Sequence, residues 1–324
     1  MNTRLDHSLL VAVMLAATGC GTVDPEDTGM EPDEPDAPDT TAPSVVGTTP
    51  TANATGVGAL ATITVTFSEP MDPPTVAAAY TSAELPADKV EFHWNPEQTV
   101  LTIQPQGELE YAEGIGTDPN ALAAKQYAVA IGTGAKDLVG NSLAAPMALS
   151  FATKKRMLAS FPIDADLSRV IRDATVLSVA NPIWIGDNNT GQTYRSYLTF
   201  DLTTLPANSE IEAAEFSARQ AAPSGLPYGI GGVVAQHVTY ASIEVAAAAQ
   251  AMSLPGMFSE DPVLETKRLD ITSQVSDDVT NRVARGNRSQ FRLQIDTPTD
   301  SDGNIDTAVF TKDTFTLLAL YLTP

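Results

Sequence analysis

Apolar and polar side chains alternate in short runs along most of the chain. Over residues 197–202 (YLTFDL) every second side chain is apolar, which is the pattern of a half-buried strand. Residues 205–209 then bring a proline and an asparagine suited to a turn, and an apolar pattern resumes over 211–216. This stretch therefore predicts two strands of a buried sheet joined by a tight polar turn.

The first half of the chain repeats this alternation in runs separated by Pro, Gly and Asn. The runs are Val45–Val46, Ile63–Phe67, Val90–Trp94, Val100–Ile103, Tyr127–Ile131 and Leu149–Phe151. Many short strands with turn residues between them are typical of a β-sandwich. We therefore predict a first folded domain over residues 42–153, followed by a solvated basic linker at 154–159.

The second half, residues 160–324, predicts another sandwich that includes one or two short helices. Residues 243–252 are rich in alanine, and Val275, Val279 and Val283 recur at four-residue spacing before Gly286. Both segments are expected as helices on the edge of the sandwich. Each predicted domain has its own alternating strands, so each should have its own core and fold without the other. The short link between them predicts limited bending.

Several motifs of the first domain resemble a known family, the S-layer-type bacterial Ig-like domain. They are Thr49–Pro50, Ala54–Val57, Ile63–Met71, Leu101–Pro105, Lys136–Asn141 and Leu149–Thr153. The resemblance implies an Ig-like β-sandwich over 42–153. Residues 110–124 depart from it, because they form a longer connection than the family's usual turn.

The second domain resembles the DNRLRE-type, or disaggregatase-related, β-sandwich modules. The resemblance rests on Trp184–Asp187, Tyr194–Leu202, Leu205–Pro206, Ile211–Ala214, Leu269–Thr272, Ser289–Leu293, Asp300–Gly303 with Asp306, and Leu317–Tyr321. It implies a jelly-roll-like module of a secreted or surface protein, of a kind associated with glycan binding and not with catalysis. The expected fold class is all-β, an Ig-like sandwich followed by a jelly-roll-like sandwich.

The first twenty residues have the features of an export signal. Arg4 supplies a positive charge, residues 9–17 are apolar but too short to span a bilayer, and small residues lead to Cys20. This resembles a bacterial lipoprotein signal, so Cys20 is the expected lipidation site and a membrane the expected partner. Gly21, in place of an aspartate, favours the outer membrane. The alternative is an ordinary secretory signal.

Composition narrows the functional classes further. Residues 21–41 combine many Asp, Glu and Pro residues without a basic one, which predicts a solvated tether. The whole chain carries a net charge of −22, which argues against nucleic acid and anionic lipid as partners. Its single cysteine excludes an internal disulfide.

The sequence offers little for catalysis. Beyond the signal, His93 and His237 are the only histidines, each lies within a predicted strand of a different domain, and neither completes a nucleophile–base pair or a zinc site. Accidental pairs of carboxylates are expected in a chain with 40 acidic residues. We therefore expect a protein that is not an enzyme.

Calcium is the cofactor that the sequence suggests. Asp300, Asp302, Asn304 and Asp306 place oxygen-bearing side chains at every second position, so a curled loop could gather them around a hard cation. The run departs from an EF-hand because Ile305 stands at the glycine position and Thr311 at the twelfth. The alternative is a hairpin turn between strands around residues 291 and 309.

Sugar binding would use exposed aromatic rings beside polar side chains. If Leu198 and Phe200 point inward, alternation turns Tyr197 outward, and inward residues 183 and 185 turn Trp184 outward. Asp187 and Arg195 lie nearby in sequence. Trp184, Asp187, Arg195 and Tyr197 are therefore the candidate ligand-binding residues.

Two functions remain open after this reasoning. The first is a lipid-anchored envelope protein that displays a binding module, with an extracellular glycan or envelope polymer as the expected ligand. The second is a purely structural envelope lipoprotein that acts as a spacer without a ligand.

Overall fold

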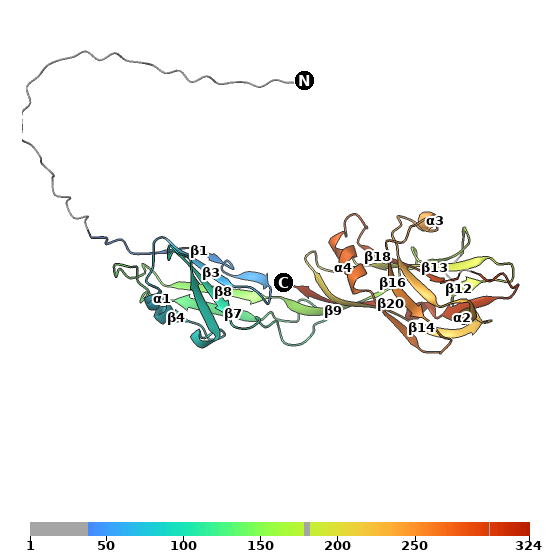
Figure 1. Ribbon diagram of the computed structural model, residues 1–324, viewed down its shortest axis with the longest axis horizontal. Helices are drawn as coiled ribbons and strands as arrows, with labels where there is room; N and C mark the ends of the chain where they lie inside the picture. Colours follow the sequence, from blue (N-terminus) through green and yellow to red (C-terminus); the bar gives the residue numbers. More distant parts are fainter. Residues whose placement is uncertain (1–37, 178–181, 298) are drawn as a thin grey trace, which may run out of the picture. The chain divides into compact units, whose positions relative to one another are not determined.

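The computed structural model describes residues 38–177, 182–297 and 299–324, and Figure 1 shows the chain as a ribbon. The described part is an all-β protein with two sandwich domains and a few short helices. The predicted signal with its lipidation site Cys20, and nearly all of the predicted tether, lie outside the described residues.

The first domain consists of two four-stranded sheets. One sheet has the order β1 (Val45–Thr49), β3 (Ile63–Phe67), β6 (Val100–Pro105) and β5 (Val90–Trp94). The other has the order β2 (Ala54–Val57), β8 (Met147–Thr153), β7 (Gln126–Ile131) and β4 (Tyr80–Thr81). Helix α1 (Pro73–Ala79) and a 3₁₀ turn at Ala87–Lys89 lie in the connections.

Alternation explains the core of this domain. Ile63, Val65 and Phe67 of β3 are buried, while the threonines between them are partly exposed. On the facing sheet, Tyr127 and Phe151 stack with ring centroids 5.6 Å apart. The predicted Ig-like sandwich is confirmed, although the sequence pattern did not reveal the short β2 and β4.

The second domain is built on a curled twelve-stranded sheet, drawn from green through yellow to red in Figure 1. Its main path runs β16 (Ser253–Ser259), β15 (Val233–His237), β18 (Arg288–Ile295), β13 (Thr193–Asp201), β12 (Ile183–Asp187), β19 (Asp306–Phe310), β14 (Glu210–Ser224), β20 (Thr316–Thr323) and β9 (Lys155–Pro162). Strands β10 (Arg169–Arg172), β11 (Thr175–Val176) and β17 (Thr266–Asp270) branch from it.

Strand β14 is long enough to serve two parts of this sheet. Its first half pairs with β20 and its last residues pair with β19, with a shift in register between Ala221 and Ser224. The side chains enclosed by the curl form one core, in which Phe216 of β14 packs against Phe258, Phe291 and Phe315. This confirms the sandwich predicted for the second half of the chain.

The strands predicted around residues 194–216 exist as β13 and β14, but they do not pair with each other. Their connection is instead held by Arg282, whose guanidinium donates hydrogen bonds to the carbonyls of Leu202, Leu205 and Pro206 at 3.1–3.3 Å. The stretch is therefore a link between non-adjacent strands. Sequence alternation finds strands but cannot reveal which neighbours they choose.

The two predicted helices are shorter than expected. Helix α3 covers only Ile243–Ala246, and α4 covers Thr272–Thr280, so Val283 lies beyond it and is 91% exposed. Val275 and Val279 do face the core. A further short helix, α2 (Pro227–Ile230), and a 3₁₀ turn at Lys312–Thr314 complete the domain.

The predicted linker at 154–159 is wrong, because β9 begins at Lys155, two residues after β8 ends. The basic residues there are engaged: Lys154 and Arg156 form ion pairs with Glu210 and Glu212, and Lys155 Nζ donates to the Pro119 carbonyl at 3.0 Å. The junction is thus a structured segment.

The insertion at 110–124 packs on this junction, and we call it the clasp. Gly116 N donates to the Arg156 carbonyl at 2.9 Å, and Leu158 N donates to the Gly116 carbonyl at 2.8 Å. Leu122 packs against the core that contains fully buried Met157. The two domains therefore have separate cores, as predicted, but the clasp of the first domain contacts the core of the second.

Candidate functional site

Strand β12 presents the candidate aromatic platform. Ile183 and Ile185 enter the core, and Trp184 between them is 38% exposed, as alternation predicted. Its ring meets the half-buried Tyr194 edge-on, with centroids 6.2 Å apart. Arg195 follows on β13, half-buried, and no other described residue forms a hydrogen bond or ion pair with its guanidinium.

Tyr197 is fully buried, so the expectation that its ring is exposed is wrong. The alternation itself is correct, because Tyr197 points away from the main core. A second small cluster covers that side: Tyr240 meets the Tyr197 ring edge-on at 5.9 Å, and Ile243 and Ala246 of α3 complete the cover. The alanine-rich segment, whose role the sequence did not reveal, therefore encloses this face of β13.

Asp187 ends β12 and is only 2% exposed. Its burial keeps it from meeting a surface ligand, so the prediction of Asp187 as a glycan-binding residue is wrong. Its Oδ1 atom is buried without a hydrogen-bond partner among the described residues. Directly opposite in the β12–β19 register lies Asp306, which is 4% exposed.

Asp306 belongs to the predicted acidic loop. Ligand oxygens of Asp300, Asp302 and Asp306 all lie within 4.8 Å of one another. Asn304 is exposed and donates two hydrogen bonds to the Asp302 carboxylate. One comes from its backbone N–H at 2.7 Å and the other from its side-chain amide. Strands β18 and β19, which flank this loop, are not neighbours in the sheet, so the hairpin alternative is wrong.

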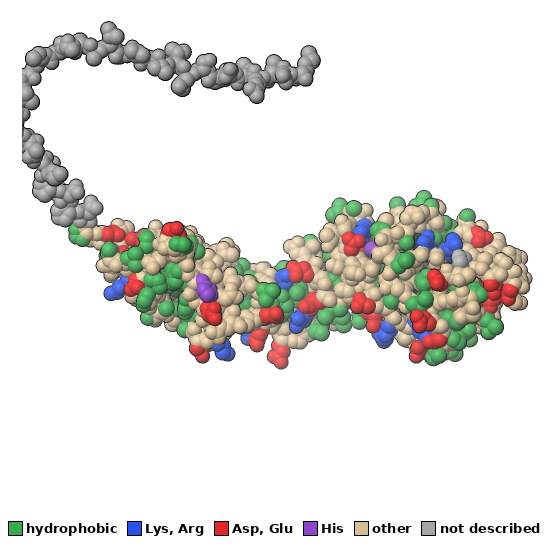
Figure 2. Space-filling view, viewed as in Figure 1, with side chains coloured by type: hydrophobic (Ala, Val, Ile, Leu, Met, Phe, Trp, Pro, Cys, Tyr) green, Lys and Arg blue, Asp and Glu red, His purple; other side chains and the backbone are tan. Residues whose placement is uncertain are grey.

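The acidic loop borders a surface hollow of about 650 Å³. The loop contributes Asp300 and residues 302–306, and the other lining residues are Asn189, Gly225, Leu226, Gly229 and Ile230. Three connections of the second domain thus meet here. Figure 2 shows acidic side chains, in red, spread over the face that it draws.

His237 and Asp278 form a buried side-chain hydrogen bond that links β15 to α4. His237 Nε2 lies 2.9 Å from Asp278 Oδ2, and both side chains are at most 2% exposed. Arg285 also pairs with Asp278 and lies 2.5 Å from Asp277. Because the His237 and Asp278 side chains are buried, this pair has a structural role. Sequence reasoning missed it, although Asp278 lies three residues after buried Val275 on the same helical face.

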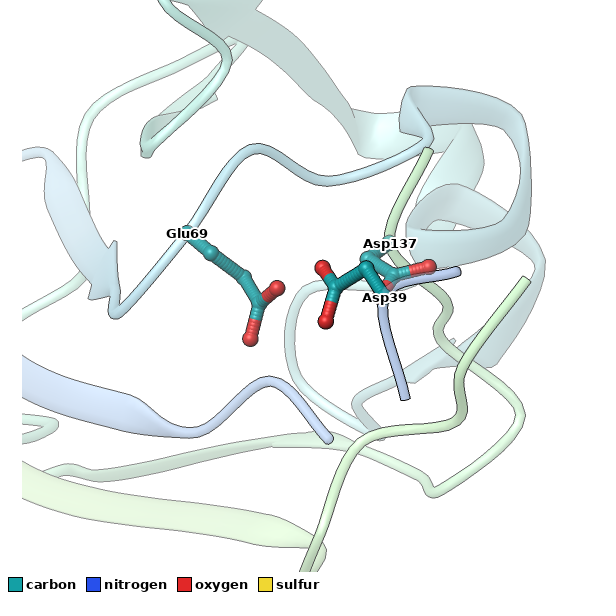
Figure 3. A group of neighbouring side chains, drawn as sticks. All are labelled: Asp39, Glu69 and Asp137. Atoms are coloured by element: carbon teal, nitrogen blue, oxygen red, sulfur yellow. The ribbon is translucent and has the colours of Figure 1, made fainter. Parts of the chain in front are cut away.

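Two further acidic side chains, Glu69 and Asp137, both labelled in Figure 3, lie in the loops of the first domain. Carboxylate oxygens of Glu69 and Asp137 lie within 4.8 Å of each other. Burial alone would raise the pKa of Asp137. Hydrogen bonds from the Asn141 side chain and from the backbone of Asn141, Gly140 and Val139 outweigh it and lower the pKa. Asp137 therefore acts as the acceptor that organises its own loop.

The comparison with known families agrees with the sandwich fold of the first domain. Residues 39–153 match the family described as "Bacterial Ig-like domain". The first domain is thus a bacterial Ig-like domain, which is a non-catalytic fold. This match is typical of an extracellular or cell-envelope protein. No curated protein matches the sequence.

Several solved structures are similar over part of their length. An L,D-transpeptidase from Mycobacterium smegmatis aligns at 21% identity and a TM-score of 0.25 over 61% of this chain and 65% of that one. Alpha-2-macroglobulin from Escherichia coli aligns at 10% identity and a TM-score of 0.25, over 83% of this chain and 71% of that one. S-layer protein rSbsC aligns at 12% identity and a TM-score of 0.24, over 71% of this chain and 33% of that one. The chain thus spans less than two thirds of the transpeptidase.

Within the described ranges, none of the helices combines the length and the apolar character that crossing a bilayer requires.

Proposed function

We propose that the protein is a lipid-anchored, non-catalytic display protein of the bacterial outer membrane. In this proposal Cys20 carries the lipid, the acidic tether and the Ig-like domain act as spacers, and the second domain binds an extracellular glycan or envelope polymer. The second domain would be a module of the DNRLRE type, as its sequence motifs suggest.

The observation that carries the proposal is the clasped junction. Strand β8 passes into β9 through Lys154 alone, and the clasp adds two backbone hydrogen bonds across the same point. A catalytic pair of domains commonly needs relative motion, whereas a display protein benefits from a fixed spacing between anchor and binding module. The Ig-like match supports the same class.

Trp184 is the residue on which we base glycan binding. Aromatic rings serve as apolar platforms for sugars when polar groups lie beside them. The exposed Trp184 ring has Tyr194 at its edge, and the guanidinium of Arg195, which pairs with no other described residue, lies on the neighbouring strand. Tyr197 is excluded from this surface by its burial.

A glycan array tests the binding role, with the soluble chain of residues 21–324, which begins just after Cys20, as the probe. We expect retention on a limited set of glycans, lost in Trp184→Ala and kept in the control Val283→Ala, whose side chain is 91% exposed in the wild type. No retention above background, with or without calcium, would favour the structural spacer instead.

Membrane fractionation tests the anchor separately. Several acyl chains on one cysteine bind a bilayer almost irreversibly. We therefore expect the wild-type chain in the outer-membrane fraction and Cys20→Ser in the soluble fraction. If Cys20→Ser remains in the membrane and resists carbonate and salt, lipidation at Cys20 is wrong.

A further inference from the structure

The loop end of the second domain brings three carboxylates together, and a fourth, that of Asp187, belongs to the residue opposite Asp306 in the sheet. We propose that Asp300, Asp302 and Asp306, with Asp187 closing the buried side, form a calcium site. This inference is independent of glycan binding, since it rests on other residues and on another ligand.

The three loop carboxylates are already gathered. Their ligand oxygens lie within 4.8 Å of one another, a spacing that fits oxygens around one ion at about 2.3–2.6 Å each. Asp300 and Asp302 are exposed, whereas Asp306 is buried, so the group runs from the surface into the domain. An ion could therefore enter from solvent and meet a buried ligand.

The backbone fixes Asp306 tightly. Leu226 N donates a hydrogen bond to Asp306 Oδ1, and a Cβ atom at Gly225, where φ is +67°, would lie 2.4 Å from that same oxygen. On the other side, a Cβ at Gly186 would lie 1.9 Å from the Asp306 carbonyl oxygen. Gly225 thus lets the chain approach the carboxylate of Asp306, and Gly186 lets β12 approach its backbone.

Asp187 supplies an independent indication of a missing partner. Its Oδ1 is buried and accepts no hydrogen bond from any described residue, and its position pairs with Asp306 across β12 and β19. Directly opposed residues of antiparallel strands point to the same face, with Cβ atoms about 4.5–5.5 Å apart. The free oxygen of Asp187 therefore belongs to the side of the sheet on which Asp306 joins the cluster.

The charges of this group are not balanced by the protein. No Lys or Arg in the described part of the chain forms an ion pair with any of the four carboxylates. Two buried carboxylates side by side are unfavourable unless a cation, a proton or water compensates them. A divalent cation would neutralise this repulsion directly.

The donor set identifies the cation class. All four side chains offer carboxylate oxygens, and among the described residues no histidine or cysteine joins them, which favours a hard cation over zinc. Ligands drawn from a loop and a strand end suit the variable geometry of calcium better than the strict octahedron of magnesium. Asn304, a predicted ligand, acts instead by positioning Asp302 through its two hydrogen bonds.

Thermal unfolding of the soluble chain 21–324, after removal of metal with EGTA, tests the site. We expect millimolar calcium to raise the unfolding temperature of the second domain, and terbium to give luminescence sensitised by Trp184, three residues before Asp187 on β12. Weak binding to the acidic tether would not stabilise the fold, so it does not mimic the thermal shift.

Variants make the test specific. Because Asp300 and Asp302 are exposed, the double variant Asp300→Asn with Asp302→Asn should fold normally and bind calcium at least about tenfold more weakly. Asp187→Asn should raise the unfolding temperature without calcium, by removing repulsion, and should reduce the calcium-dependent shift. The control Asp313→Asn, an exposed acid in the Lys312–Thr314 turn, should behave as wild type.

Two results would overturn the proposal. The first is the absence of any thermal shift with millimolar calcium. The second is an undiminished shift in the double variant, which would place the ion elsewhere, for example near Glu69 and Asp137. If Asp187→Asn lowers stability without calcium and keeps the full shift, its carboxylate has a structural partner and is not a ligand.

Discussion

The clasp at 110–124 makes a quantitative prediction about how the two domains unfold. Replacing residues 113–123 by Gly-Ser-Gly would remove it while leaving every fully buried core residue of both domains in place. The ends can be joined, because Thr153 Oγ1 lies 2.8 Å from the Glu110 carbonyl and 3.4 Å from the Lys125 carbonyl. We expect the deletion to uncouple the domains without preventing either from folding.

The main part of the effect follows from the backbone hydrogen bonds and the apolar contact that are lost. The two backbone hydrogen bonds between Gly116 and β9 contribute about 1 kcal/mol each. Leu122, partly buried against the second core, contributes about 1 kcal/mol more. The total of about 3 kcal/mol corresponds to a fall of roughly 6–12 °C in the first unfolding transition.

Calorimetry of the soluble chain, the deletion and a point variant would measure this coupling. Leu122→Ala should lower the first transition by roughly a third as much as the deletion. Leu138→Ala is the matched control, because this leucine of the same domain is 61% exposed. Transitions that are unchanged in the deletion would refute the reasoning and show that the clasp contacts add no net stability.

Three further predictions concern single residues. Asp278→Ala leaves His237 without its buried partner and should cost about 3–5 kcal/mol in urea unfolding, whereas Asp277→Ala, which removes a half-exposed side chain, should cost less than about 1 kcal/mol. Gly225→Ala should destabilise the second domain, because its Cβ would lie 1.9 Å from the Ile305 carbonyl oxygen. In the control Gly140→Ala the new Cβ meets no atom within 4 Å, so this variant loses stability only through its positive φ. Urea midpoints would measure the difference between the two variants. The pKa of Asp137 is lowered in the folded domain, so the stability that its carboxylate contributes is present above the unfolded pKa of about 3.9 and is lost as pH falls through the folded pKa. The urea midpoint of the Ig-like domain should therefore fall more steeply on acidification in wild type than in Asp137→Asn.

Strands were predictable where alternation was strong. The runs at 63–67 and 90–94 coincide with β3 and β5, because each presents one row of apolar side chains to a single core. The two-residue β4 carries too few positions to show a period. Pairing was not predictable, since the partners of β13 and β14 depend on contacts made far along the chain.

Exposure was harder to predict than strand position. Trp184 is exposed as expected, but Tyr197 is covered by a segment around residues 238–246 that follows about forty residues later in the sequence. The acidic loop was found from its spacing alone, because its three clustered aspartates lie within seven residues. The opposition of Asp187 to Asp306 could not be found this way, because it arises from the register of two distant strands.

The connection through β9 also determines how the protein responds to mechanical load. If the N-terminal end is anchored and the second domain is pulled, tension passes from β8 along the backbone into β9. Strand β9 is paired with β20 along eight successive positions, from Lys155 opposite Thr323 to Pro162 opposite Thr316. Pulling along the strand loads this ladder in shear, so its hydrogen bonds must break together and not one after another. The second domain is therefore attached through a strand whose eight pairs with β20 share the load.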